Sequence, residues 1–196
     1  MTNKVIWVGG VHGVGKTSSL KLASAQNPSL EYLYLGRMFF ETAEHMGMRW
    51  EELADRSKLL RVENRVKDIL EEKITESDLL IDSHFAIHFG DLTYPGFHNH
   101  NLKRLLCHND IKKGLINLIA DPLIILRRRN RSKKQFWAYS TEEDLDIIAR
   151  ELGDSQNYLN YFMRALGPDI IAETIDTSKS SITEVAEKIG VIYNEI

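Results

Sequence analysis

The sequence predicts an α/β fold in which helices cover both faces of a central five-stranded parallel sheet. Five short apolar runs have the length of buried strands, and they cover residues 4–9, 31–35, 78–84, 115–120 and 169–176. The segments between these runs space their apolar residues as amphipathic helices do. Strands that alternate with helices in this way form parallel sheets with right-handed crossovers.

Local signals support the individual elements in chain order. The run KVIWVG (4–9) leads through a glycine-rich turn into a helix expected from Lys16, and EYLYL (31–35) is the weaker second strand because it is short. Helical spacing follows over residues 36–47 and 50–73. Asp121 and Pro122 are suited to the N-cap and first turn of another helix. A capping-box pattern opens residues 140–153, and residues 181–196 form a last amphipathic helix.

Bulk composition indicates one domain over residues 1–196 and excludes several classes of protein. The formal net charge of −3 makes a nucleic-acid partner unlikely, because such proteins usually carry an excess of positive charge. Cys107 is the only cysteine, which excludes an internal disulfide and a four-thiolate metal site. No apolar stretch approaches the roughly 20 residues of a membrane helix, and no secretory leader precedes the first strand. We therefore expect a cytoplasmic protein with no membrane segment.

The strongest motif is GVHGVGKT, which lies between the first strand and the first helix and satisfies G-x-x-x-x-G-K-[ST]. Its glycines allow backbone N–H groups to surround phosphate oxygens at a helix N-terminus. Lys16 would reach the β- and γ-phosphates, and the Thr17 hydroxyl would hold Mg²⁺. The motif predicts a three-layer P-loop NTPase fold that binds ATP. The expected nucleotide-binding residues are Gly10, Val11, His12, Gly13, Val14, Gly15, Lys16, Thr17 and Ser18.

A second polar segment, Asp82-Ser83-His84, follows the apolar run LLI. Asp82 is the best candidate for the carboxylate that holds Mg²⁺, in part through water. His84 would point the same way from an extended backbone and could orient Asp82, contact substrate or simply pack. Sites in parallel sheets lie beyond the carboxyl ends of the strands. The glycine loop, this segment and Asp176-Thr177 are all expected there.

The run RRRNRSKK (127–134) concentrates positive charge. Phosphoryl transfer requires such groups, because they stabilise the negative charge of the transition state. On a helix Arg127 and Arg131 share a face, while Arg128 points elsewhere. A solvated basic surface or a nucleic-acid patch is the alternative interpretation.

These motifs together resemble those of the archaeal-type adenylate kinases, a branch of the P-loop nucleoside monophosphate kinases. The glycine loop is similar to that family's G-x-P-G-V-G-K-[ST], with His12 at the usual proline. Residues 36–47 are similar to its G-x-x-M-x-E-x-A-x-x-x-G motif. IDSH (81–84) resembles its I-D-T-H, YPG (94–96) its L-P-G turn, and ADP (120–122) with Arg127 and Arg128 the entry to its lid.

The resemblance implies an adenylate kinase that converts ATP and AMP to two ADP. It implies a helical monophosphate-binding region at 36–75 and a lid at about 127–142. Lys16, Arg127 and Arg128 would be catalytic, and Gly36, Arg56 and His84 would bind the acceptor. The family also implies a homotrimer.

Two alternatives stay open. The lid sequence continues as KKQFWAYS, where the family usually has an R-x-R-D type sequence. The protein could therefore be a nucleotide-binding regulatory or ATPase-like protein with weak or no kinase activity. It could also be a P-loop kinase for another small acceptor.

Overall fold

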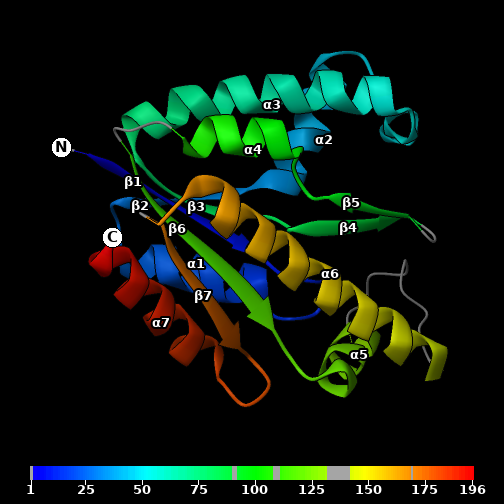
Figure 1. Ribbon diagram of the computed structural model, residues 1–196, viewed down its shortest axis with the longest axis vertical. Helices are drawn as coiled ribbons and strands as arrows, with labels where there is room; N and C mark the ends of the chain where they lie inside the picture. The colour runs from blue at the N-terminus through cyan, green and yellow to red at the C-terminus, as the bar shows by residue number, and fades with distance from the viewer. Residues whose placement is uncertain (1, 90–91, 108–110, 132–141, 169) are drawn as a thin grey trace.

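A five-stranded parallel sheet with strand order β2-β3-β1-β6-β7 forms the centre of the protein (Figure 1). The computed structural model describes residues 2–89, 92–107, 111–131, 142–168 and 170–196. The sheet strands are β1 (Asn3–Gly9), β2 (Leu30–Tyr34), β3 (Asp78–Asp82), β6 (Ile111–Ile119) and β7 (Ile171–Asp176). The predicted fold class, with five parallel strands, is confirmed.

Helices cover the sheet on both faces, as Figure 1 shows. One face carries α1 (Lys16–Gln26) and α7 (Ile182–Glu195). The other carries α3 (Arg56–Glu76), α4 (Asn99–Leu106) and α6 (Glu142–Leu166), with α2 (Leu35–His45) behind α3 and α4. The helix α5 (Pro122–Arg131) lies beyond the carboxyl end of β6. Among the described helices none has the length and apolarity needed to cross a membrane.

Strand β1 lies at the centre of the sheet because both of its faces are apolar. Val5 and Trp7 belong to the core beneath α3, α4 and α6, whereas Ile6 and Val8 belong to the core beneath α1 and α7. All four side chains are at most 1% exposed. Burial of such a side chain stabilises the fold by roughly 1.5–3 kcal/mol, so the strand that leads into the glycine loop is firmly anchored.

Several element boundaries differ from the sequence predictions. The helix expected over residues 50–73 divides into a short 3-10 helix, η1 (Trp50–Ala54), and α3. Asp55 separates them because its side chain accepts a hydrogen bond from the backbone N–H of Ser57, at 2.8 Å, and so caps α3. An antiparallel hairpin of β4 (Ala86–Phe89) and β5 (Leu92–Pro95) was not predicted. The capping box predicted at 140–141 lies outside the described residues.

The carboxyl ends of the central strands meet at one edge of the sheet. Ser83 N–H donates to the Val8 carbonyl at 2.9 Å, and Thr177 N–H donates to the Ile119 carbonyl at 2.8 Å. These bonds hold the segments after β3 and β7 beside the segments after β1 and β6. The three polar segments expected at this edge are all there.

Candidate active site

The glycine loop turns sharply between β1 and α1. Gly10, Gly13 and Gly15 have φ angles of 135°, 89° and 98°, values that favour glycine because a side chain would clash with the backbone. Val11 and Val14 are buried and anchor the loop in the core beneath α1 and α7. His12, Thr17 and Ser18 are exposed. The predicted nucleotide-binding residues thus form one loop that leads directly into a helix N-terminus.

Lys16 folds back over the loop and is buried. Its Nζ donates to the carbonyl of Gly10 at 2.5 Å and to the carbonyl of Val11 at 3.1 Å. Burial lowers the pKa of Lys16 from 10.5 to about 8, and the nearby Asp82 carboxylate partly opposes that change. The lysine therefore lies inside the loop, and the Asp82 carboxylate offsets only part of the effect of burial on its pKa.

Asp82 is the centre of a hydrogen-bonded group at the end of β3. Its Oδ2 accepts from Thr17 Oγ1 at 2.8 Å and from Tyr32 Oη at 3.0 Å. Burial and the Asp82 carboxylate raise the pKa of Tyr32, so the phenol stays protonated and donates. The structure thus brings together the two residues predicted to hold Mg²⁺. It adds Tyr32, which the sequence analysis did not identify.

His84 contacts the loop from the side of β3. Its Nδ1 lies 2.8 Å from the Gly10 carbonyl, and because a carbonyl only accepts, Nδ1 carries the proton. Burial, followed by the charge of Lys16, holds the pKa of His84 well below its usual value. The ring is therefore neutral, and it packs against the His12 ring at a tilt of 48°, with centroids 4.6 Å apart. His84 thus packs against the loop at Gly10 and His12.

The basic run lies on α5, and two of its arginines contact the loop. Arg128 donates from Nη1 to the Val14 carbonyl at 3.1 Å and from Nη2 to the Thr177 carbonyl at 2.8 Å. Arg129 donates from Nε to the His12 carbonyl at 2.9 Å, and its Nη2 lies 2.5 Å from Glu151 Oε2 on α6. Arg127 is exposed. Thus Arg128 lies at the loop as predicted, whereas Arg129 lies there in place of the predicted Arg127.

Helical periodicity could have identified Arg129. The buried face of α5 is defined by Ile125, which is fully buried, and the residue four positions later is Arg129. Side chains four apart lie on one face of a helix. Arg129 is accordingly buried and reaches the loop, whereas Arg127 lies on the exposed face. Residues 132–141 of the predicted lid lie outside the described residues.

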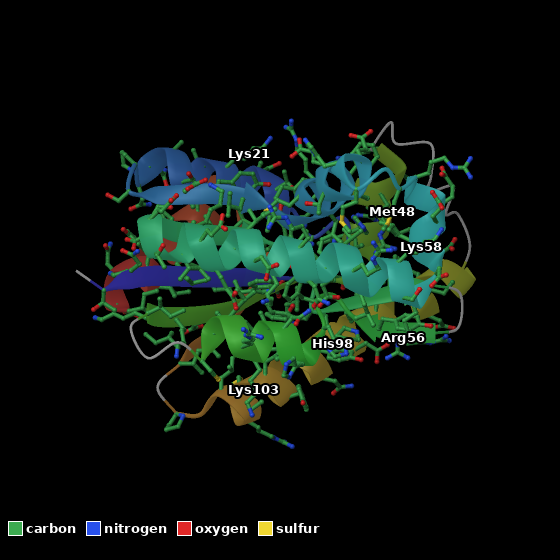
Figure 2. All side chains as sticks on the ribbon, turned by 90° about the horizontal axis from the view of Figure 1, so that it is seen from above. Lys21, Met48, Arg56, Lys58, His98 and Lys103 are labelled. Atoms are coloured by element: carbon green, nitrogen blue, oxygen red, sulfur yellow. The ribbon has the colours of Figure 1, made fainter. Side chains whose placement is uncertain are left out.

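Of the three predicted acceptor residues, His84 contacts the loop, whereas Gly36 and Arg56 lie on α2 and α3. Gly36 lies in the first turn of α2, where a methyl group would lie 3.0 Å from Tyr34 Oη. Arg56 is the first residue of α3 and is exposed. Figure 2 shows Arg56 and Lys58 at the end of α3 that lies toward β4 and β5. The structure does not place Arg56 against the loop.

A family model described as an AAA domain matches residues 9–146 of this chain. The chain belongs to this AAA-domain family. The matched range begins in the last residue of β1 and includes the glycine loop, Asp82, His84 and the basic run on α5. The family match therefore contains the site residues described above except Glu151 and Thr177.

A similar protein of known function supports the predicted resemblance. An adenylate kinase from Pyrobaculum aerophilum is 25% identical over 139 residues, which are 69% of this chain and 68% of that protein. Together the two matches confirm the predicted resemblance to adenylate-kinase-like P-loop kinases and the predicted phosphotransferase class.

Solved structures confirm the fold of this AAA-domain protein. A shikimate kinase from Bacteroides thetaiotaomicron has a TM-score of 0.60 at 13% identity, and the alignment covers 98% of each chain. A tunicamycin resistance protein from Deinococcus radiodurans has a TM-score of 0.61 at 17% identity, covering 96% of this chain and 94% of that one.

Proposed function

We propose that the protein is an ATP-dependent nucleoside monophosphate kinase, with AMP as the favoured acceptor. The observation that carries the proposal is the convergence of Lys16, Thr17 and Asp82 at the glycine loop. The similarity to an adenylate kinase supports a nucleotide acceptor, and residues 36–75 would form the region that binds it.

The donor set at the loop fits Mg²⁺. Thr17 Oγ1 and the Asp82 carboxylate are hard oxygen donors 2.8 Å apart, and Mg²⁺ prefers oxygen and keeps several waters. Thr17 would bind the ion directly, and Asp82 would hold it through water. A bound Mg²⁺ would neutralise the charge that develops on the phosphate oxygens.

The reaction requires no side-chain nucleophile. An oxygen of the acceptor phosphate attacks the γ-phosphorus in line, a new P–O bond forms, and the bond from the γ-phosphorus to the β–γ bridging oxygen breaks. ADP then leaves with the bridging-oxygen electron pair. Catalysis of this step depends on positioning and on charge. Lys16, Arg128 and Arg129 would supply positive charge on the donor side, with Arg127 and the rest of the predicted lid (about 127–142) closing over it.

The acceptor would approach from the side of α2 and α3. Gly36 and the exposed Arg56 would hold its phosphate, and His84 would contact it near the loop. The neutral ring of His84 leaves Nε2 with a free lone pair, which can accept a hydrogen bond. His84 is thus suited to contact a hydroxyl or a protonated phosphate oxygen.

That same neutral histidine favours a second candidate, a kinase for a small alcohol. A hydroxyl acceptor must lose a proton when it attacks, and a neutral imidazole can take it. The two candidates predict different effects of His84→Gln. With an alcohol, the substitution would lower kcat and change its pH profile. With a monophosphate, it would mainly raise the KM of the acceptor.

An assay of ADP formation tests the proposal. ATP and Mg²⁺ are combined with AMP, CMP, UMP, GMP, shikimate or no acceptor, and phosphorus NMR identifies the product. We expect ADP to accumulate rapidly only with AMP. A rate that is the same without an acceptor would indicate the ATPase-like alternative and overturn the proposal.

Two lysine variants serve as the assay's controls. Lys16→Met should abolish ADP formation, since Lys16 is expected to contact the phosphates. Lys21→Met removes an exposed lysine of the same helix and should retain activity. A Lys16→Met variant as active as the wild type would show that the ADP is not formed at the glycine loop.

A further inference from the structure

Tyr32 holds the buried Asp82 carboxylate from a neighbouring strand. Tyr34 of β2 pairs with Asp82 of β3, so Tyr32 lies two residues earlier on the same strand. Its hydroxyl reaches along the sheet and donates to Asp82 Oδ2 at 3.0 Å. Thr17 Oγ1 donates to the same oxygen at 2.8 Å. Both bonds fall on Oδ2, so neither of them occupies Oδ1.

We propose that Tyr32 is a positioning residue for the metal site, one that fixes the orientation of Asp82. The inference rests on the proposed function, because it assumes that Thr17 and Asp82 hold Mg²⁺. Thr17 would then turn an oxygen lone pair toward the ion while its hydroxyl hydrogen stays bonded to Asp82. Tyr32 is not expected to bind the ion itself, so it gives Asp82 a second hydrogen-bond donor besides Thr17. Tyr32 thus keeps Oδ2 in place and leaves Oδ1 for a metal-bound water.

The orientation of Asp82 matters because the described residues offer the ion few other ligands. No group of three or more histidine, cysteine, aspartate or glutamate side chains that could hold a metal occurs in the described part of the chain. The ion would be held by one hydroxyl, one carboxylate, water and the phosphates. A rotation of the single carboxylate would therefore not be compensated by a second one.

Tyr32 is itself well placed for this role. Its ring packs against the core beneath α1 and α7, which limits the movement of its hydroxyl. Residues that orient metal ligands typically change metal affinity or activity 10–100-fold when they are replaced. We expect an effect in the lower part of that range, because Asp82 acts through water.

The chain offers a matched control at the other end of β3, the strand that carries Asp82. Tyr193 Oη donates to Asp78 Oδ2 at 2.7 Å, and Asp78 is the first residue of β3. Tyr193→Phe therefore removes the same kind of bond, a phenol to an aspartate of β3, far from the loop. Tyr32→Phe and Tyr193→Phe retain the ring in each case, and circular dichroism verifies that both variants fold.

The test measures metal affinity directly. Mn²⁺, a paramagnetic substitute for Mg²⁺, is titrated into each protein saturated with a non-hydrolysable ATP analogue, and electron paramagnetic resonance reports the free ion. Affinity for the analogue in EDTA is measured separately. Tyr32→Phe should weaken Mn²⁺ binding about tenfold and leave the affinity in EDTA unchanged. Tyr193→Phe should change neither.

Each other result overturns a specific statement. Unchanged Mn²⁺ affinity in Tyr32→Phe would overturn the positioning role, as would equal losses in both variants or an equal loss in EDTA. If the wild-type protein bound the analogue but no Mn²⁺, the metal site itself would be wrong. If the wild-type protein bound neither the analogue nor Mn²⁺, the proposed function itself would be wrong.

Discussion

Arg129 and Glu151 form a buried ion pair between α5 and α6. Arg129 Nη2 lies 2.5 Å from Glu151 Oε2, and the two side chains are 2% and 13% exposed. The same guanidinium donates to the His12 carbonyl in the glycine loop. One side chain thus connects α5, α6 and the loop, so the shape of the loop depends on a contact made more than 100 residues away.

The first prediction concerns this ion pair. Arg129→Met should destabilise the protein by about 3–5 kcal/mol, because it leaves Glu151 as an unpaired buried charge. Arg129→Met with Glu151→Met should recover much of that loss, since no charge is then buried. Urea unfolding measures both. Arg127→Met, on the exposed face of α5, should stay within about 0.5 kcal/mol of the wild type; equal losses at 127 and 129 would contradict the structure.

Nucleotide affinity should depend on pH through Lys16. In the free protein its pKa is about 8, and bound phosphates would raise it because they favour the charged form. Above pH 8 the lysine must therefore take up a proton on binding, and affinity should fall by up to about tenfold per pH unit. Calorimetry in buffers of different ionisation enthalpy would detect the proton uptake.

Lys16 should also affect stability in the same pH window. Its pKa in the folded protein lies below the unfolded value of 10.5, so the unfolded chain binds more protons between about pH 8 and 10.5. Stability should therefore rise with pH in this range relative to Lys16→Met, which lacks the titrating group. If the two proteins showed parallel pH profiles, the lowered pKa would be wrong.

A third prediction tests the acceptor side. Arg56→Ala should raise the KM for AMP about tenfold or more, because a charge-assisted hydrogen bond contributes roughly 1.5–3 kcal/mol. The KM for ATP should stay the same. Lys58→Ala removes a cation two residues further along α3 whose Nζ is 2.5 Å from Glu52 Oε1, so it is the control. A KM for AMP that responds equally to both substitutions would indicate only general electrostatic attraction.

A fourth prediction concerns two glycines. A methyl group at Gly96 would lie 1.8 Å from the His84 carbonyl oxygen, so Gly96→Ala must displace the backbone that carries His84. We expect a loss of about 1–3 kcal/mol together with weaker nucleotide binding. A methyl group at Gly153, within α6, would meet nothing within 4 Å among the described residues beyond its own stretch of helix. Gly153→Ala should therefore stabilise the protein by about 0.5–1 kcal/mol. Thermal unfolding of the two variants should move in opposite directions.

The fold was predictable because its main signals are local. Apolar runs such as that of β1 are typical of a parallel sheet with helices on both faces, because both faces of each central strand are then buried. The glycine loop was predictable for the same reason, since one short motif contains its turn, its lysine and its hydroxyl. The β4–β5 hairpin was not, because its four-residue strands carry too little pattern.

The parts of the site that were missed depend on long-range geometry. The role of Tyr32 follows from the pairing of β2 with β3, and strand order is not encoded in a local pattern. Arg129 reaches the loop because α5 packs through Ile125, whereas the resemblance implied that Arg127 and Arg128 are the catalytic arginines. The functional roles of all these residues remain predictions that the experiments above address.

The close contact between Gly9 and Phe85 has a consequence for the evolution of this site. A methyl group at position 9 would lie 2.1 Å from Phe85 Cδ2, so the aromatic ring occupies the space where a side chain would stand. The two positions must therefore vary together in related sequences. A relative with alanine or a larger residue at position 9 should carry a small residue at 85, and a relative that keeps the phenylalanine should keep the glycine.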